Sequence, residues 1–306
     1  MSTPSRAVVI VSGGAAISPF TTPTAGCSSG LSAGSTDTGL REALLGAGLA
    51  VYTSPANVGR RAVTDDPEAN GFDGAPEQLP AELTVNAVGT IDEAGRHLAA
   101  FLGFLATRDD VREVDLVCHS MGGLFSRAAI RELKTAGHPL RIRSLTTLGT
   151  PWTGSFVAEV AGGLADMSLA AGDPRTESII AEMRDQLTGG SEGAGQQVTS
   201  HYLAGTDGWN ERQAGILDGT PVTIVAGDWF QASDGDAHAW PHDGLVSVSS
   251  ALAEHVSPAV VQPRTTHLFH DVHSIFFADQ FGLPWHQALT WNPEVFQVVL
   301  DAIAEA

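Results

Sequence analysis

VDLVCHSMGG, residues 114–123, joins a short hydrophobic run to a serine, Ser120, that has a small residue two positions before it, Cys118, and another two positions after it, Gly122. The hydrophobic half has the length of a buried strand, and the residues after Gly123 continue with helical spacing. A serine at such a turn lies at a helix N-terminus, where backbone N–H groups and the helix dipole stabilise negative charge. The stretch therefore predicts a reactive Ser120 on a tight turn between a strand and a helix.

The segments on either side alternate between strand and helix patterns. Short hydrophobic runs predict strands, and apolar residues three and four apart predict helices. We expect strands over residues 8–11, 51–53, 114–117, 145–148 and 222–226, and helices over residues 35–49, 91–105, 124–135 and 293–306. Such alternation is typical of an α/β fold with a mostly parallel sheet, in which the functional groups follow the carboxyl ends of the strands.

Two segments interrupt this alternation. Residues 56–86 contain several Pro, Gly and Asp residues and are expected to be irregular. Residues 152–219 combine a small-residue amphipathic piece with Gly- and Ser-rich sequence, which indicates an insertion. The chain would then consist of a core formed by residues 1–151 and 220–306, with residues 152–219 added to it.

The composition excludes several classes of protein. The chain has 306 residues, of which 43% are hydrophobic, so it can bury a large core. Its 35 acidic and 16 basic residues give a net charge of −19, which would repel nucleic acids and anionic membranes. No apolar run approaches the roughly 20 residues of a membrane-spanning helix. Without a recognisable export signal at the N-terminus, we expect a cytoplasmic protein, and a secreted mature form stays open.

Only two cysteines occur, Cys27 and Cys118. Two are too few for a disulfide framework, and their separation fits no metal or redox motif. A single bridge between them stays open.

A second motif follows the strand predicted at residues 145–148. It reads GTPWTGS, residues 149–155. The turn at Ser120 resembles the nucleophile elbow G-x-S-x-G of the α/β-hydrolase family, with Cys118 where the first glycine usually stands. GTPWTGS resembles a Gly-Thr-Pro-x-x-Gly-Ser segment of bacterial triacylglycerol lipases and esterases. The resemblance implies an α/β-hydrolase fold with Ser120 as nucleophile, followed in the chain by an acid and then a histidine.

For the acid, HDGLVSVSSA, residues 242–251, resembles the lipase segment that carries the catalytic aspartate. We therefore expect Asp243 to be the acid. Asp228 is the second choice because it directly follows the strand predicted at residues 222–226. Asp234 and Asp236 are further candidates, although both fit a solvated turn.

For the base, THLFHDVHS, residues 266–274, contains three histidines. The family's histidine lies in the loop before the last helix, so the resemblance favours the most C-terminal one, His273. His267 and His270 lie in or beside a strand-like alternation and are expected to be structural or to line a pocket. His286 comes late in the chain and is a weaker alternative.

The oxyanion of an acyl-transfer reaction needs backbone N–H donors. Met121, directly after the nucleophile, would supply one. The resemblance takes the second from the loop after an early strand, which here reads VSGGA, residues 11–15, with Ser12 where a histidine usually stands. Gly14 is the expected donor, with Gly13 and Ala15 as alternatives.

In the resemblance, residues 152–219 occupy the place of a cap or lid. Trp152 and Phe156 are expected to bind the substrate, and so is His119, which lies behind the nucleophile. The lipase resemblance also suggests a structural calcium near Asp271 or Asp279, but the family's ligand spacing is not reproduced, and we expect no required cofactor.

The sequence thus predicts a serine hydrolase that acts on small-molecule or lipid carboxylic esters, a lipase or esterase, through Ser120, His273 and Asp243 and an acyl-enzyme. An acyltransferase or amide hydrolase with the same triad is one alternative. A non-catalytic binding protein with the same fold is another. The acyl chain length and the oligomeric state are left open.

Overall fold

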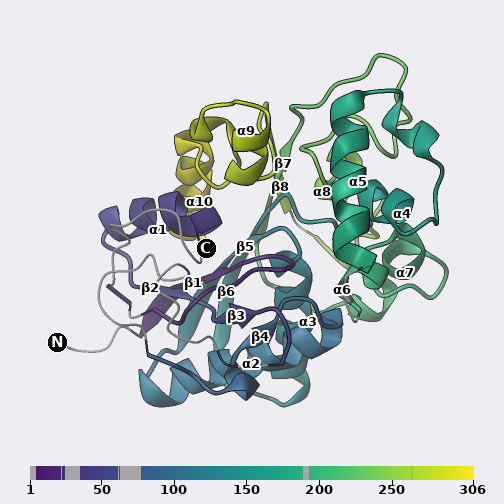
Figure 1. Ribbon diagram of the computed structural model, residues 1–306. Helices are drawn as coiled ribbons and strands as arrows, with labels where there is room; N and C mark the ends of the chain where they lie inside the picture. The colour runs from purple at the N-terminus through teal and green to yellow at the C-terminus, as the bar shows by residue number, and fades with distance from the viewer. Residues whose placement is uncertain are drawn as a thin grey trace.

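The computed structural model describes residues 5–21, 23–24, 35–60, 62, 77–188, 193–262 and 264–306. Its centre is a six-stranded sheet in the order β2-β1-β5-β6-β7-β8, with parallel pairing at every step (Figure 1). The strands are β1 (Arg6–Val11), β2 (Val51–Thr53), β5 (Glu113–His119), β6 (Arg141–Leu148), β7 (Val222–Gly227) and β8 (Arg264–Phe269). The predicted α/β class and all five predicted strands are confirmed, and β8 contains the strand-like alternation around His267.

Helices connect these strands and cover the sheet. They are α1 (Ser35–Gly46), α2 (Ile91–Arg108), α3 (Gly122–Thr135), α4 (Phe156–Ala161), α5 (Pro174–Thr188), α6 (Ala194–Gln197), α7 (Ser200–Ala204), α8 (Val248–Ala251), α9 (Ile275–Gln280) and α10 (Pro293–Glu305). Short 3-10 turns lie at η1 (Ala81–Leu83), η2 (Met167–Ala170), η3 (Glu211–Gln213) and η4 (Trp285–Gln287). The predicted helices are confirmed, including the cap of α10, where the Asn292 side chain accepts the N–H of Glu294. No helix in the described part of the chain is long and apolar enough to cross a membrane.

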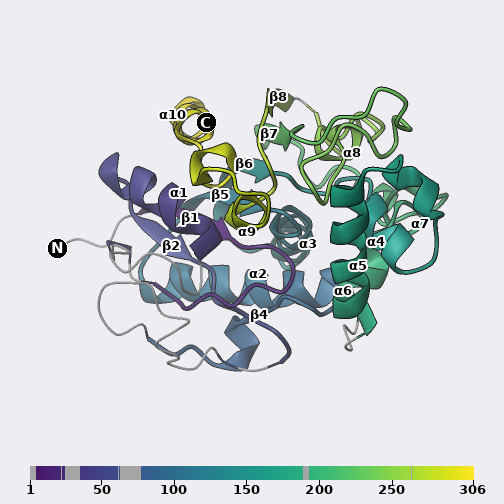
Figure 2. The ribbon, with the colours of Figure 1, turned by 45° about the horizontal axis from the view of Figure 1, so that its top comes forward.

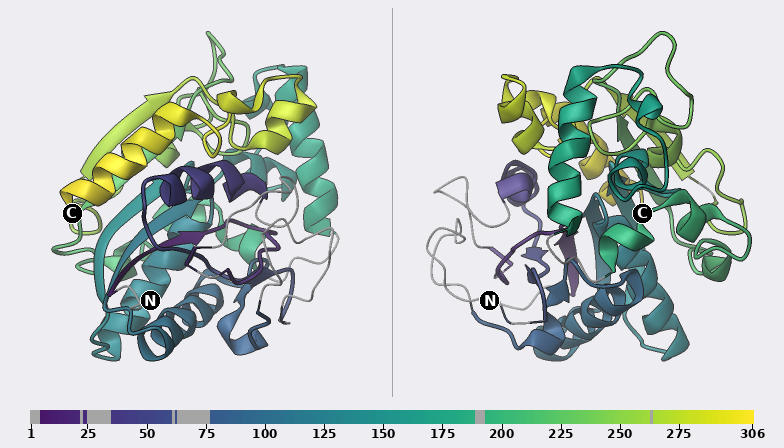
Figure 3. Two further views of the ribbon diagram at one scale, coloured as in Figure 1. Left: turned by 90° about the vertical axis from the view of Figure 1, so that its left-hand side faces the viewer. Right: turned by 45° about the vertical axis from the view of Figure 1, so that its right-hand side comes forward.

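The sheet separates two hydrophobic cores. Val8 and Ile10 of β1 pack in the core formed with α1 and α10, whereas Val9 and Val11 pack in the core formed with α2 and α3. Successive side chains of a strand point to opposite faces, so one buried strand serves both cores. Figure 3 shows α1 and α10 on one side of the sheet and α2 on the other.

Residues 56–86 are more regular than we expected. Ala56–Asn57 forms β3, which pairs in parallel with β4, Val85–Asn86. A pair of two-residue strands is too short to leave a period-two pattern in the sequence, so composition alone predicted an irregular segment here. Within this stretch, residues 61 and 63–76 lie outside the described residues.

The segment 152–219 lies between β6 and β7 and contains α4, η2, α5, α6, α7 and η3. It stands beside the carboxyl ends of the strands, with α4, α5 and α7 grouped together in Figure 2. A third hydrophobic cluster joins α4 and α5 to the loop after β7 and to α9. The segment is therefore packed against the edge of the sheet where the predicted site residues lie.

Candidate active site

Ser120 follows β5 on a turn with a strained backbone. Its φ is +55°, in the left-handed region that a residue with a side chain rarely adopts. The surroundings hold it there, because Ser120 N–H donates to the carbonyl of Leu148 (2.8 Å) and the Thr150 hydroxyl donates to the Ser120 carbonyl (2.7 Å). The helix α3 begins two residues later, so the turn directs the serine side chain outward at a helix N-terminus.

Small residues around Ser120 make this turn possible. A Cβ added to Gly122 would lie 2.2 Å from the carbonyl oxygen of Val11, so any side chain there would force α3 away from β1. Cys118 is fully buried, with its sulfur 3.0 Å from the Ser126 hydroxyl, and burial raises the pKa of its thiol to about 12. Cys118 is thus a small, protonated core residue with a free thiol, while Cys27 lies outside the described residues.

Asp243 and His273 form a buried hydrogen-bonded pair. Nδ1 of His273 lies 2.7 Å from Oδ2 of Asp243, and the N–H of His273 donates to the Asp243 carbonyl (2.8 Å). The other carboxylate oxygen, Oδ1, accepts the N–H groups of Leu245 (2.9 Å) and Val246 (2.8 Å). A carboxylate that accepts from Nδ1 leaves Nε2 as the acceptor of the ring. Nε2 of His273 is buried and has no hydrogen-bond partner among the described residues, Ser120 included.

Gly149 contacts both members of this pair, and the sequence analysis did not single it out as a site residue. It follows β6 with φ +58°, and a Cβ added to it would lie 2.9 Å from both Asp243 Oδ2 and His273 Nδ1. The sequence feature that could have identified Gly149 is its place in the Gly-Thr-Pro motif, directly after a predicted strand. Its tertiary neighbours come from distant parts of the chain, so the motif alone could not reveal them.

The loop after β1 lies against the nucleophile turn. A Cβ added to Gly13 would lie 2.5 Å from Cβ of Ser120, and one added to Gly14 would lie 3.0 Å from the sulfur of Met121. The two predicted oxyanion donors, Gly14 and Met121, are therefore neighbours. The N–H of Ala15 already donates to the carbonyl of Ala87 (3.1 Å), which makes this alternative donor the least suitable in the observed arrangement.

The alternative acids and bases have partners or positions of their own. Asp228 pairs with His270 (2.9 Å), an exposed side chain, and Asp236 accepts the N–H of His238 (2.8 Å). Neither interaction involves His273. His267 lies on β8 beside Val225 of β7, and His286 lies in η4. Among the alternatives considered from the sequence, only Asp243 is joined to His273.

The predicted substrate-binding residues are all buried. Trp152 is 0% exposed, lies under the guanidinium of Arg127 (4.5 Å) and donates to the Thr147 hydroxyl (3.3 Å), so it offers no surface to a ligand in this arrangement. Phe156 is 1% exposed and contacts the ring of His242 at 4.9 Å. His119 bonds through Nε2 to the carbonyl of His273 (3.0 Å).

His242, next to Asp243, is a second residue that the sequence analysis did not assign. Its ring stacks on Phe230 at 4.8 Å, Nδ1 accepts the N–H of Gly244 (3.0 Å), and Nε2 lies 3.2 Å from the hydroxyl of Thr176 in α5. Burial lowers the pKa of His242 to about 4, so the ring is neutral near pH 7. Through Thr176, His242 joins α5 of segment 152–219 to the loop that carries Asp243.

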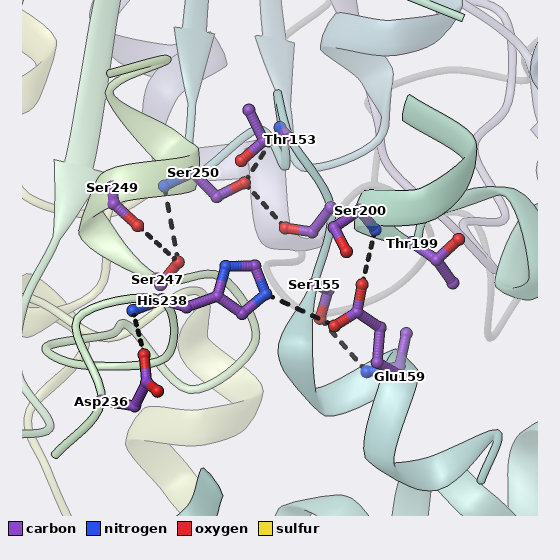
Figure 4. A network of polar contacts seen from close by, with 12 residues as sticks. Thr153, Ser155, Glu159, Thr199, Ser200, Asp236, His238, Ser247, Ser249 and Ser250 are labelled. Carbon is purple, nitrogen blue, oxygen red and sulfur yellow. Dashed lines mark hydrogen bonds and ion pairs between the residues drawn. The ribbon is translucent and has the colours of Figure 1, made fainter. Parts of the chain in front are cut away.

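Polar contacts at the start of segment 152–219 make a further connection to that loop. The Ser155 hydroxyl donates to the Leu245 carbonyl (2.6 Å). The Ser250 hydroxyl accepts the N–H of Thr153 (3.1 Å) and donates to the carbonyl of Gly154 (2.7 Å). Figure 4 shows Glu159 of α4 between His238 and the N-terminus of α7, where it accepts the N–H of Ser200 (2.5 Å). Backbone and side chains therefore fix this end of segment 152–219 to the loops around Asp243.

The residues suggested for calcium have other partners. Asp271 is buried and accepts the amide of Asn292 (2.7 Å), and burial raises its pKa to about 6. Asp279 accepts the indole N–H of Trp285 (2.7 Å). In the part of the chain that the structure describes, no three His, Cys, Asp or Glu side chains converge as a metal site would require.

No protein-family model and no curated protein sequence matches this chain. Solved structures do match it over nearly its whole length. The mature form of the Bacillus licheniformis lipase BlEst2 is 16% identical with a TM-score of 0.54, covering 98% of this chain and 91% of that one. The product of gene lin2722 from Listeria innocua is 14% identical with a TM-score of 0.51, covering 98% and 94% of the two chains. The Staphylococcus hyicus lipase is 13% identical with a TM-score of 0.50, covering 99% and 96%.

These similarities establish the class of fold. The parallel sheet, its order and its flanking helices are those of an α/β-hydrolase fold. The resemblance noted in the sequence is thus confirmed at the level of the fold, while the chemistry of the site has to be argued from the residues themselves.

Proposed function

We propose that this protein is a carboxylic ester hydrolase in which Ser120, His273 and Asp243 act as a catalytic triad. The observation that carries the proposal is the buried Asp243–His273 pair, whose Nε2 is left without a partner at the edge of the sheet that bears Ser120. An orphaned buried acceptor is costly, and a general base awaiting a proton is a physical reason for keeping one.

The mechanism follows from the roles of these atoms. Ser120 Oγ attacks the ester carbonyl while its proton moves to Nε2 of His273, and Asp243 stabilises the imidazolium that forms. The N–H groups of Gly14 and Met121 would hold the oxyanion. Collapse of the tetrahedral intermediate gives an acyl-enzyme, and the His273 proton passes to the departing alcohol. Water, deprotonated by the same histidine, then releases the acid and restores Ser120.

Ester hydrolysis is favoured over the alternatives because two solved structures of similar fold are named lipases. In this proposal, residues 152–219 form a cap that borders the acyl-binding region. An acyltransferase or amide hydrolase would use the same triad with a different acceptor or substrate. Comparing hydrolysis with alcoholysis products, and esters with matched amides, separates these activities.

The test is covalent labelling combined with turnover. We expect a fluorophosphonate to add once to the wild-type protein, and p-nitrophenyl esters to be hydrolysed with a chain-length preference that distinguishes an esterase from a lipase. Ser120→Ala should abolish the adduct and reduce turnover by about 10³-fold or more. Ser257→Ala, at an exposed serine, is the matched control and should retain both. A folded wild-type protein that neither reacts nor turns over would favour the non-catalytic alternative.

A further inference from the structure

His119 lies between the nucleophile and the base and contacts both. It is the last residue of β5, pairs with Leu148 of β6 and is bonded covalently to Ser120. Its ring lies 4.6 Å from the ring of His273, and its Nε2 lies 3.0 Å from the His273 carbonyl. The side chain thus spans from the rigid end of the sheet to the loop that carries the base.

The direction of this hydrogen bond is not ambiguous. A carbonyl oxygen can only accept, so Nε2 of His119 must carry the proton. Burial, followed by the neighbouring His273, lowers the pKa of His119 to about 3. His119 is therefore neutral over the range in which ester hydrolysis would be measured, and the bond is present throughout that range.

The backbone of His273 is held from two sides. Its N–H donates to the carbonyl of Asp243, and its carbonyl accepts from His119. The first contact fixes His273 relative to the acid, and the second fixes it relative to the nucleophile turn. The contact with His119 matters for the reaction because it sets the distance between His273 and Ser120, and a displacement of about 1 Å between reacting groups lowers the rate by about 10²-fold.

We propose that His119 is a positioning residue, whose ring N–H holds the His273 backbone at the correct distance from Ser120. This inference rests on the proposed hydrolase function and adds to it a device that sets the separation of base and nucleophile. It replaces the substrate-binding role predicted for His119 from the sequence, because the residue is only 6% exposed and its ring Nε2 is bonded to the carbonyl of His273.

Two variants of His119 separate the hydrogen bond from packing. His119→Gln keeps a donor at a similar reach, and His119→Leu keeps a similar volume without a donor. We expect His119→Leu to lower kcat by about 10- to 100-fold with little change in KM, and His119→Gln to recover most of that loss. His97 is the matched control, since its ring also bonds to a backbone carbonyl, that of Thr84 (2.9 Å), in a different part of the fold. His97→Leu should leave kcat unchanged even where it lowers the Tm.

A second readout does not depend on turnover. In Ser120→Ala protein, the proton on Nδ1 of His273 should give a low-field NMR resonance, identified by its loss in His273→Gln. Adding His119→Leu should broaden this resonance through faster exchange with water, whereas adding His119→Gln should preserve it. If the resonance depends on His119 but the wild-type protein hydrolyses no ester, the positioning role stands and the proposed function falls. Unchanged kcat and an unchanged resonance in His119→Leu would overturn the positioning role.

Discussion

Gly149 shows how one residue without a side chain constrains the candidate site. It has a left-handed backbone, and the space that a Cβ would fill is occupied by the Asp243 carboxylate and the His273 ring. Both the left-handed backbone and the lack of space for a Cβ disfavour a side chain at position 149, but a substitution would violate them with different consequences. The backbone requirement affects stability alone, whereas the steric one also displaces the two groups that must stay aligned.

Gly149→Ala is therefore expected to lower both stability and kcat, whereas a substitution at a glycine with only a left-handed backbone should lower stability alone. The left-handed backbone alone should cost about 1–2 kcal/mol, and the added methyl group should separate Asp243 from His273 and lower kcat by at least about 10-fold. Gly137→Ala is a matched control, because Gly137 has φ +61° and nothing within 4 Å of the added Cβ. Urea unfolding and p-nitrophenyl ester kinetics of the two variants test this. Equal effects on kcat would contradict the steric argument.

The sequence predicted those residues of the candidate site that stand in a recognisable motif or in a recognisable order along the chain. Ser120 stands in a strand-turn-helix pattern, and the order of Asp243 and His273 along the chain matched a family resemblance. The bonds of His119 and His242 could not be predicted, because their partners are 154 and 66 residues away in the sequence. The burial of Trp152 was also not foreseen, because a tryptophan after a Gly-Thr-Pro motif fits a pocket wall and a core position equally well.

At the scale of elements, segment 152–219 is joined to the loop after β7 by contacts that differ in chemistry. His242 is neutral and bonds to Thr176 of α5, whereas His238 forms an ion pair with Glu159 of α4 (3.4 Å). The hydrogen bond and charge of Glu159 raise the pKa of His238 above its ordinary value, while burial opposes them. Burial acts to raise the pKa of Glu159, but hydrogen bonds from His238 and Ser200 outweigh it and hold that pKa below its ordinary value.

These shifts define the pH window in which the ion pair stabilises the fold. For His238, whose folded pKa is raised, the contribution is complete below the unfolded value of about 6.5 and is lost as the pH rises through the folded value. For Glu159, whose folded pKa is lowered, the contribution is complete above the unfolded value of about 4.3 and is lost as the pH falls through the folded value. The pair should therefore stabilise most between about pH 4.5 and 6.5.

We expect His238→Gln to lower the Tm more at pH 6 than at pH 8.5, because the stabilisation from the raised pKa of His238 is complete below about pH 6.5 and is lost as the pH rises through that pKa. Thermal unfolding of both proteins at the two pH values measures this. His201→Gln, at an exposed histidine of α7, controls for the loss of a histidine at another position. A Tm difference for His238→Gln that is the same at pH 6 and pH 8.5 would show that the pair contributes no pH-dependent stability.

Elements with a long, clear periodicity were predicted well, and short ones were not. Apolar residues recur at helical spacing over residues 91–105 and indicated α2. They recur because one face of this helix is buried in the core from Ile91 to Leu105. The two-residue strands β3 and β4 are held by backbone pairing with each other, and Ala56 of β3 also pairs with Ser18. Such pairing depends on tertiary contact and leaves no local pattern for a sequence argument to use.

At the scale of the whole molecule, the excess of acidic residues is the dominant electrostatic feature. Several arginines of the described residues already form ion pairs with carboxylates: Arg6, Arg60, Arg108, Arg112, Arg131, Arg141, Arg143 and Arg175. With 35 acidic and 16 basic residues in the chain, many carboxylates have no positive partner of their own. Their mutual repulsion is stronger in the compact state than in the unfolded chain, so it opposes folding.

Salt should therefore stabilise this protein in a way that depends on its charge. At 10 mM ionic strength the Debye length is about 30 Å, and at 0.3 M it falls below about 10 Å, so repulsion between distant carboxylates is screened mainly at the higher concentration. At pH 7.5 we expect the Tm to rise by several degrees between these concentrations of NaCl. Near pH 5, close to the isoelectric point of about 4.7, the net charge is small and the same salt should raise the Tm much less. Calorimetry at both pH values tests this. A general effect of salt on the hydrophobic core would raise the Tm by the same amount at pH 5 and at pH 7.5. Equal rises in Tm at the two pH values would therefore reject charge repulsion as the cause.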